Sequence, residues 1–174
     1  MHRRTMMIGL FLVSLAAAPS ADGEISLAGV DGSLVTPLAP DPAVRGTVAL
    51  FVRTDCPISN RYAPEVRRIH ETYAERGVAF WLVYPDPAAE DGAIREHLEE
   101  YGYPMPALKD PEHRLVGRAG ASITPEAAVF DAGLREVERL FHVPADLAHL
   151  CFGVAQKDQT DPHRTDDGEH EERQ

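Results

Sequence analysis

Two uninterrupted apolar runs, separated by about the length of one helix, constrain the fold more than any other feature of this sequence. The first covers residues 47–52 and the second covers residues 78–84. Continuous apolar runs of this length are typical of strands that are buried on both faces of a sheet. The segment between them predicts an amphipathic helix closed by Gly77, because apolar side chains recur there every three or four residues. Strand, helix and strand together predict a βαβ unit with parallel strands.

The segments around this unit predict a hairpin before it and further strands and helices after it. The hairpin turns at Asp31-Gly32, and a second turn at residues 131–133 joins the last two strands. The predicted fold class is therefore α/β, with a central mixed β-sheet flanked by helices. The predicted ranges are 24–35 for the hairpin, 90–101 and 111–119 for helices, and 107–108, 127–130 and 135–141 for strands.

The two ends of the chain differ in composition from the segment between them. Arg3 and Arg4 precede an apolar run over 8–18, and small residues follow it up to residue 21. This order is typical of a secretory signal peptide, with an uncleaved membrane anchor as the alternative. Residues 157–174 hold seven acids, three bases and no large apolar side chain, which is typical of disorder. We predict an exported protein, periplasmic or secreted, with a signal peptide over 1–21, a domain over 22–152 and a disordered acidic tail over 153–174.

Charge and cysteine content exclude several classes of protein. Seventeen basic residues against 28 acids give a net charge of −11, which argues against nucleic acid and anionic membrane surfaces as partners. Two cysteines are too few for a disulfide scaffold and lack the spacing of zinc ligands. We expect no cofactor, no metal and no stable membrane insertion after processing. His70 and His97 lie among charged residues, so we expect both on solvated helix faces.

Cys56 stands where the first buried strand ends and the amphipathic helix begins. The free N–H groups and the positive end of the helix dipole favour an anion there, which lowers the pKa of a thiol. Asp55 should raise that pKa, and Arg53 and Arg61 would offset Asp55 if their side chains point inward. The alternative is that Cys56 is a small buried side chain without chemistry. The position alone leaves both interpretations open.

A second landmark, Thr124-Pro125, comes shortly before the third predicted strand. Strand, Cys56-Pro57-Ile58-Ser59, helix, strand and then Thr124-Pro125 is an order that resembles the thioredoxin-like superfamily. Within it, the sequence is most similar to the exported redoxins of the AhpC/TSA group (alkyl hydroperoxide reductase and thiol-specific antioxidant proteins). The resemblance covers about residues 24–137 and implies a thioredoxin-like fold. It also implies that the Thr124–Pro125 peptide is cis and lies against Cys56.

The same resemblance implies roles for the residues around the cysteine. The thiol would react with a protein disulfide or a peroxide, and an external thiol would act as reductant. Hydrogen bonds near the sulfur and a groove beside it would bind the substrate. The implied catalytic residues are Cys56, Thr54, Ser59 and Pro125, and the implied groove residues are Pro57 and Thr124.

Three departures from the patterns of related groups narrow this chemistry. Ser59 stands where thioredoxins carry the second cysteine of Cys-x-x-Cys, so it cannot resolve a mixed disulfide. Peroxiredoxins place a threonine three residues before their cysteine, whereas Thr54 is two before Cys56, which argues against efficient peroxidase activity. Copper chaperones of the Sco type need Cys-x-x-x-Cys, and Asn60 occupies the second of those positions.

Cys151 follows Cys56 by 95 residues, in a segment that predicts a short helix begun by Pro144. It is the candidate resolving cysteine, since an oxidising compartment permits a disulfide, and a free thiol is the alternative. We expect thiol–disulfide exchange or slow peroxide reduction through Cys56. Two other functions stay open: a redox-inactive thioredoxin-like binding module, and a 1-Cys or atypical 2-Cys peroxidase.

Overall fold

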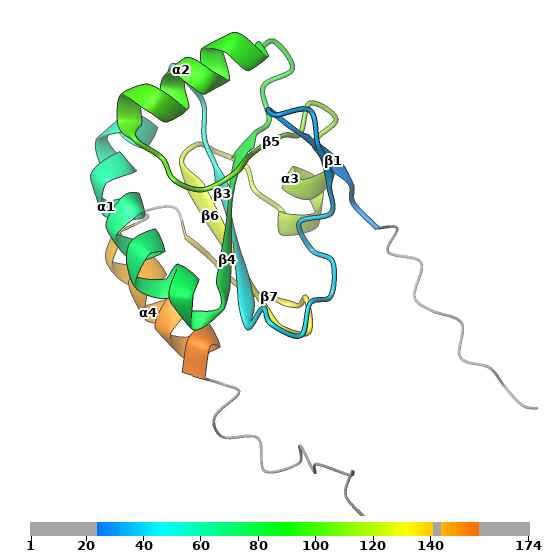
Figure 1. Cartoon of the computed structure of the whole chain (residues 1–174), viewed down its shortest axis with the longest axis vertical. Coiled ribbons are helices and arrows are strands. Elements are labelled where there is room, and N and C mark those ends of the chain that lie inside the picture. The colour runs from blue at the N-terminus through cyan, green and yellow to red at the C-terminus, as the bar shows by residue number, and fades with distance from the viewer. Residues whose placement is uncertain (1–23, 141–143, 157–174) are drawn as a thin grey trace, which may run out of the picture.

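A computed structural model describes residues 24–140 and 144–156, whose strands form one mixed sheet (Figure 1). The strand order is β2-β1-β5-β4-β3-β6-β7. β3 pairs in parallel with β4, and β4 with β5, whereas every other neighbouring pair is antiparallel. The mixed sheet confirms the predicted α/β class. The strands are β1 (Leu27–Gly29), β2 (Leu34–Val35), β3 (Gly46–Phe51), β4 (Val78–Tyr84), β5 (Ala107–Lys109), β6 (Glu126–Asp131) and β7 (Glu136–Leu140).

The predicted βαβ unit forms the centre of the molecule. β3 and β4 pair in register from Gly46 opposite Val78 to Phe51 opposite Val83, and all six residues of β3 are buried. Helix α1 (Pro57–Tyr73) joins them and continues into one 3-10 turn, η1 (Ala74–Arg76). Gly77 then reverses the chain with a φ of 82°, a left-handed conformation that glycine adopts without steric cost. The apolar runs therefore became buried parallel strands, as predicted.

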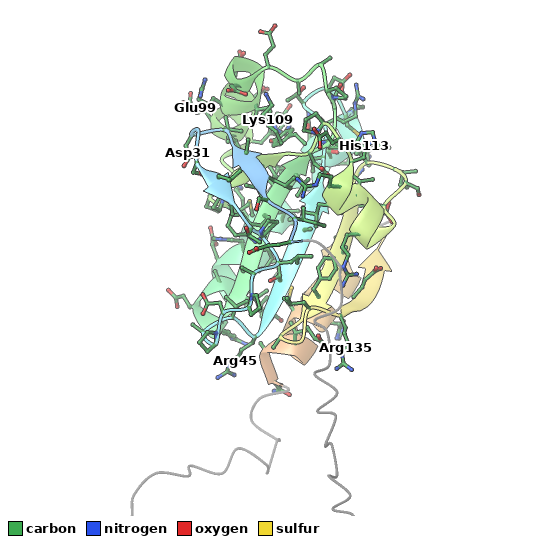
Figure 2. The ribbon with its side chains drawn as sticks, turned by 90° about the vertical axis from the view of Figure 1, so that its right-hand side faces the viewer. Asp31, Arg45, Glu99, Lys109, His113 and Arg135 are labelled. Atoms are coloured by element: carbon green, nitrogen blue, oxygen red, sulfur yellow. The ribbon has the colours of Figure 1, made fainter. Side chains whose placement is uncertain are left out.

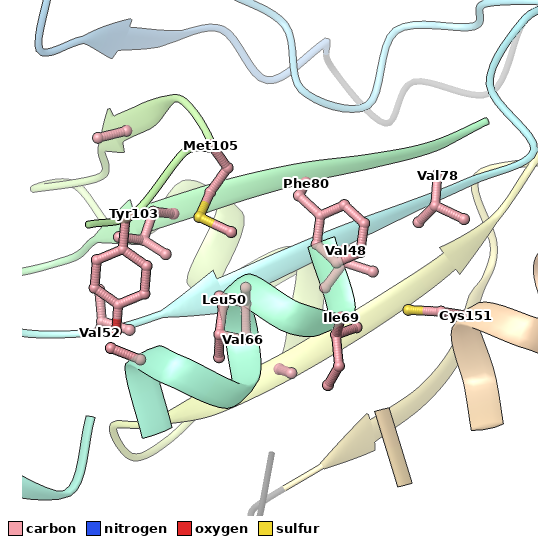
Figure 3. Packing of buried hydrophobic residues seen from close by; sticks show 14 of the residues in the cluster. Val48, Leu50, Val52, Val66, Ile69, Val78, Phe80, Tyr103, Met105 and Cys151 are labelled. Atoms are coloured by element: carbon pink, nitrogen blue, oxygen red, sulfur yellow. The ribbon is translucent and has the colours of Figure 1, made fainter. Parts of the chain in front are cut away.

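Helices cover both faces of the sheet (Figure 1). α1, α2 (Asp91–Tyr101) and α4 (Pro144–Gln156) lie on one face, and the short α3 (Arg114–Ala119) lies on the other. Because side chains alternate along a strand, Leu50 of β3 packs beneath α1 and Phe51 packs on the side of α3. Figure 3 shows part of the first of these two cores. Because helices and apolar side chains cover both faces of the sheet, a reactive site is expected at the ends of the strands.

α4 supplies the end of the domain, for which the sequence predicted only a short helix after Pro144. It packs against α1, β3 and β6. The approach is close, since a β-carbon on Gly46 would lie 2.7 Å from Cγ2 of Val154. Arg45 donates from Nη1 to the backbone oxygen of Ala155 over 2.7 Å. The folded region therefore includes residues up to Gln156, beyond the residue 152 at which we placed the domain boundary.

The carboxyl ends of β3, β4 and β5 gather at one end of the sheet. His113 lies at this end, whereas Arg45 and Arg135 lie at the opposite end (Figure 2). Nε2 of His113 donates to the backbone oxygen of Pro85 over 2.9 Å, which ties the start of α3 to the loop after β4. Cys56 and Thr124-Pro125, which the sequence singled out, lie at this end of the sheet.

Two sequence predictions lie outside the described residues, namely the signal peptide and the acidic tail from residue 157 onward. In the part of the chain that the structure does describe, no helix is both long and apolar enough to cross a membrane.

Candidate active site at the start of helix α1

Cys56 is the residue that caps the N-terminus of α1. Its φ of −88° and ψ of 106° are extended, and Pro57 then occupies the first helical position, where its missing N–H costs nothing. The N–H groups of the next residues, Ile58 and Ser59, have no partner within the helix because they belong to its first turn. At most helix starts a side-chain oxygen at the capping position accepts such donors. Here that position holds a sulfur atom.

The thiol faces the loop that precedes β6. Sγ of Cys56 donates to the backbone oxygen of Thr124 over 3.6 Å. The Thr124–Pro125 peptide is cis, which confirms the geometry that the family resemblance implied. Glu126 begins β6 directly afterwards and pairs with Phe51, the last residue of β3. The sheet therefore brings Cys56 and Thr124 together, although 68 residues separate them in the sequence.

The surroundings of Cys56 favour the thiolate. Partial burial by itself raises the pKa of this thiol, but hydrogen bonds to the charged form outweigh burial and hold the pKa below its ordinary value. The groups that lower it are the hydroxyl and N–H of Ser59, the N–H of Ile58 and the side chain of Thr124, although Sγ accepts no capping hydrogen bond of ordinary geometry from the helix start. Because these groups stabilise the anion more than the neutral thiol, the site promotes a nucleophilic sulfur.

Ser59 places a buried hydroxyl in the first turn of α1, close to Cys56. Its side chain is 1% exposed, and its hydroxyl has no hydrogen-bond partner of acceptable geometry in the structure. The same hydroxyl is nevertheless the strongest of the groups that lower the pKa of Cys56. The two observations agree if the hydroxyl bonds weakly to a thiol and well to a thiolate, which is the better acceptor. The buried Ser59 hydroxyl therefore gains a good hydrogen-bond acceptor only when the sulfur of Cys56 is ionised.

The charge of Asp55, which we expected to oppose ionisation of Cys56, is paired. Nε and Nη2 of Arg53 donate to the two carboxylate oxygens of Asp55 at 3.0 and 3.2 Å. Nη2 of Arg53 also lies 2.9 Å from Oδ2 of Asp86. The hydrogen bond from Arg53 holds the pKa of Asp55 below its usual value. Arg53 therefore has the compensating role that the sequence suggested, while the Arg61 side chain is exposed.

The remaining predicted residues occupy the rim and the floor of the site. Pro125 is buried, whereas Pro57 is exposed and Thr124 is half-buried. Ile58 follows Cys56 by two residues and Ile123 directly precedes Thr124, and the two are 56% and 52% exposed. They are two of the three large apolar side chains that are clearly exposed in the described residues. The segments around the sulfur therefore expose two large apolar side chains, beside the charged pair of Arg53 and Asp55.

Cys151 does not lie beside Cys56 in this structure, and both thiols are free. It is completely buried in the core, and burial raises its pKa to about 12. Cys151 and Val52 lie at opposite ends of the core shown in Figure 3. Val154, one helical turn further along α4, contacts the start of β3, whereas Cys56 follows the end of that strand. A β-strand of six residues spans about 17 Å, well beyond disulfide reach.

His97 was wrongly predicted to be solvated. Its side chain is 3% exposed, and burial lowers the pKa of its imidazole. The helical spacing contained the signal that we missed, because His97 lies three residues after the buried Ile94 and four before Tyr101. His70 is half-buried, and burial also lowers its pKa. Among the described residues, no cluster of His, Cys, Asp and Glu could hold a metal ion.

Sheet order, helix placement and the cis-proline loop beside the cysteine define a thioredoxin-like fold. The sequence model of the AhpC/TSA family matches residues 39–137, which is more than half of the chain. The chain therefore belongs to the AhpC/TSA family. No match is found among curated proteins.

Solved structures show the same fold. A secreted Mycobacterium tuberculosis disulfide oxidoreductase homologous to E. coli DsbE aligns with a TM-score of 0.60 at 16% identity, over 76% of this chain and 94% of its own. MTB dsbF aligns with a TM-score of 0.63 at 18% identity, over 75% and 95%. An uncharacterized conserved protein from Geobacillus kaustophilus aligns with a TM-score of 0.56 at 27% identity, over 66% and 63%. The sequence identities are low, so the fold is what these structures share with the chain.

Proposed function

We propose that this protein is a thiol oxidoreductase that acts through the single thiolate of Cys56. One observation carries the proposal: Cys56 caps the N-terminus of α1 with its sulfur against the cis-proline loop. The groups around it hold the pKa of the thiol below its ordinary value. An inert buried cysteine has the opposite environment, as Cys151 illustrates. The family to which the chain belongs supports a redox role in general terms.

In the first step, the Cys56 thiolate attacks one sulfur of a protein disulfide. A new S–S bond forms to Cys56, the old one breaks, and the released thiolate takes up a proton from water. Ser59 has no thiol with which to open the resulting mixed disulfide. An external thiol therefore attacks next, forms its own disulfide with the substrate sulfur and releases the Cys56 thiolate. The net reaction exchanges one disulfide for another: the sulfur of the external thiol is oxidised into the new disulfide, one sulfur of the original disulfide is reduced to a thiol, and the number of S–S bonds is unchanged.

Peroxide reduction is a slower second reaction of the same thiolate. The sulfur attacks one peroxide oxygen, the O–O bond breaks, and Cys56 becomes a sulfenic acid while an alcohol or water leaves. A first external thiol condenses with the sulfenic acid and releases water, and a second restores the free cysteine as the external disulfide forms. Cys151 can act as the resolving thiol only if α4 leaves the core, because Cys151 is completely buried.

The two exposed isoleucines near Cys56 indicate which part of a substrate the site would contact. Ile58 and Ile123 would pack against apolar side chains next to the target disulfide, and burial of exposed apolar surface would favour that contact. Pro57 and Thr124 would line the groove between them. We further propose that the chain is exported through residues 1–21, since an oxidising compartment supplies protein disulfides.

Capture of a mixed disulfide tests the function. The protein with residues 1–21 removed is incubated with oxidised glutathione and then analysed by mass spectrometry, before and after excess dithiothreitol. We expect one glutathione adduct on Cys56, reversed by dithiothreitol, in the wild type and in the matched control Cys151→Ser. Cys56→Ser should form no such adduct. No adduct on the wild type would support the redox-inactive binding module instead, and a Cys56–Cys151 bond after hydrogen peroxide would support an atypical 2-Cys peroxidase.

A further inference from the structure

Behind the first turn of α1 lies a line of buried and half-buried polar side chains that the chemistry of Cys56 does not use directly. It starts at the end of β4, where the hydroxyl of Tyr84 lies 2.8 Å from Nδ1 of His97. Nε2 of His97 lies 2.8 Å from Oδ1 of Asn60. Nδ2 of Asn60 lies 3.1 Å from the hydroxyl of Tyr101 and 3.4 Å from the backbone oxygen of Thr54. The line thus ends at the turn that carries Cys56.

The direction of every hydrogen bond in this line follows from the Thr54 carbonyl. A carbonyl oxygen can only accept, so the Asn60 atom that faces it must be the amide nitrogen. The amide oxygen of Asn60 then accepts from Nε2–H of His97. Because a neutral imidazole has one donor and one acceptor, Nδ1 of His97 accepts from the Tyr84 hydroxyl. With neutral His97, one arrangement of protons satisfies the whole line.

Aromatic contacts hold the imidazole in this orientation. The ring centroid of His97 lies 4.9 Å from that of Tyr101, 5.6 Å from that of Tyr103 and 5.8 Å from that of Tyr84. Tyr103 also lies with its hydroxyl 3.5 Å from the backbone oxygen of Ser59. Side chains from α2 and the segment after it therefore contact two successive residues of α1, Ser59 and Asn60. Tyr84 of β4 contacts His97 and not α1. Ser59 is the residue whose hydroxyl and N–H lower the pKa of Cys56, and Asn60 directly follows it.

We propose that His97 and Asn60 are positioning residues that hold the Thr54–Cys56 turn and the first turn of α1 at the distance where Ser59 stabilises the thiolate. The proposal rests on the proposed function of Cys56. Tyr84 and His97 are buried and Asn60 and Tyr101 are half-buried. Placing these polar side chains out of water costs free energy unless each finds a hydrogen-bond partner, whereas apolar side chains at the same positions would need none. The hydrogen bonds of this line run from Tyr84 to the Thr54 carbonyl, next to Cys56. A role in fixing the geometry of that turn explains why the line ends there.

His97→Phe is the direct test, because it keeps a buried ring of similar size, adds no charge and does not touch Cys56. The matched control is His70→Phe, the same change at a half-buried histidine of α1 whose ring packs against Phe80 and whose Nδ1 has no partner among the described residues. The measurement is the rate of Cys56 alkylation by iodoacetamide across pH, on the protein with residues 1–21 removed and Cys151→Ser in every variant. Urea unfolding of each variant reports whether it is folded.

We expect His97→Phe to shift the midpoint of alkylation to higher pH and to slow alkylation about tenfold at pH values below the wild-type midpoint. His70→Phe should keep the wild-type profile. If His97→Phe fails to fold, the double variant Tyr84→Phe/His97→Phe removes the orphaned hydroxyl and should show the same shift. A folded His97→Phe or double variant with the wild-type midpoint overturns the positioning role alone. A wild-type midpoint at the ordinary value of a free thiol overturns both that role and the proposed function.

Discussion

Replacing Ser59 with alanine should make the folded protein more stable and the Cys56 thiol less reactive. The two effects have one origin, the Ser59 hydroxyl, which is buried without a partner of acceptable geometry and yet lowers the pKa of Cys56. While Cys56 is a neutral thiol, the hydroxyl is an unsatisfied polar group in the core. Once Cys56 ionises, the hydroxyl becomes a donor to a negative charge.

The magnitudes follow from these two states. A hydrogen bond to a charged group contributes about 1.5–3 kcal/mol, and the lower end applies here because Cys56 is partly exposed and water can replace part of the loss. Since about 1.4 kcal/mol corresponds to a factor of ten, the thiolate fraction below the thiol pKa should fall about tenfold. Removing an unsatisfied buried hydroxyl from a helix should raise the free energy of unfolding of the reduced protein by up to about 1 kcal/mol.

Both quantities can be measured on one preparation. Iodoacetamide alkylation at about pH 6 reports the thiolate fraction, and urea unfolding at the same pH reports stability. Thr72→Ala is the control, because it removes a hydroxyl from the same helix on an exposed face, where it donates to the Arg68 carbonyl. It should leave alkylation unchanged. If Ser59→Ala alkylates as fast as the wild type, or loses stability, the Ser59 hydroxyl does not have the role assigned to it.

Three further predictions concern other parts of the structure. Gly46→Ala should lower the free energy of unfolding by about 1–3 kcal/mol, because the new methyl group would overlap Val154 of α4. Adding Val154→Ala should make the cost of Gly46→Ala smaller than it is in the wild type, and additive costs in urea unfolding would argue against that contact. Burial lowers the pKa of His97, so the unfolded chain binds the proton first and stability should fall as the pH drops below about 6.5. The decrease should be smaller in His97→Phe, and an equal decrease would contradict this cause. Ser59→Cys places a thiol one helical turn from the first, within disulfide reach, so oxidation should give an intramolecular bond that mass spectrometry detects and the wild type lacks.

Most of the fold could be predicted because its signals are local. The runs over 47–52 and 78–84 are continuous and apolar, and a buried parallel strand is the structure in which such a run fits best. Gly77 ends the helical segment between them, and its left-handed φ reverses the chain without help from distant residues. The position of Cys56 at a helix start followed from the same local pattern. The packing of α4 did not, because nothing in its sequence says that it covers β3 and contacts Gly46.

The parts of the site that the sequence did not predict are contacts between side chains of different elements. Helical spacing could have placed His97 in the core, but its bonds to Tyr84 and Asn60 depend on how α2 sits over β4 and α1. Pairing of Arg53 with Asp55 depends on the direction of two side chains in a loop, which a sequence does not specify. The contact between Cys56 and Thr124 was expected from the family resemblance and from no local signal.

The pH dependence of Cys56 alkylation in the wild type tests the central claim most directly. The protein, with residues 1–21 removed and Cys151→Ser to leave one thiol, reacts with iodoacetamide at a series of pH values, and the rate reports the thiolate fraction. The hydrogen bonds at the start of α1 predict a midpoint below about 8.5, the ordinary value for a cysteine. A midpoint at or above about 8.5 would show that the site does not activate its thiol and would contradict the account.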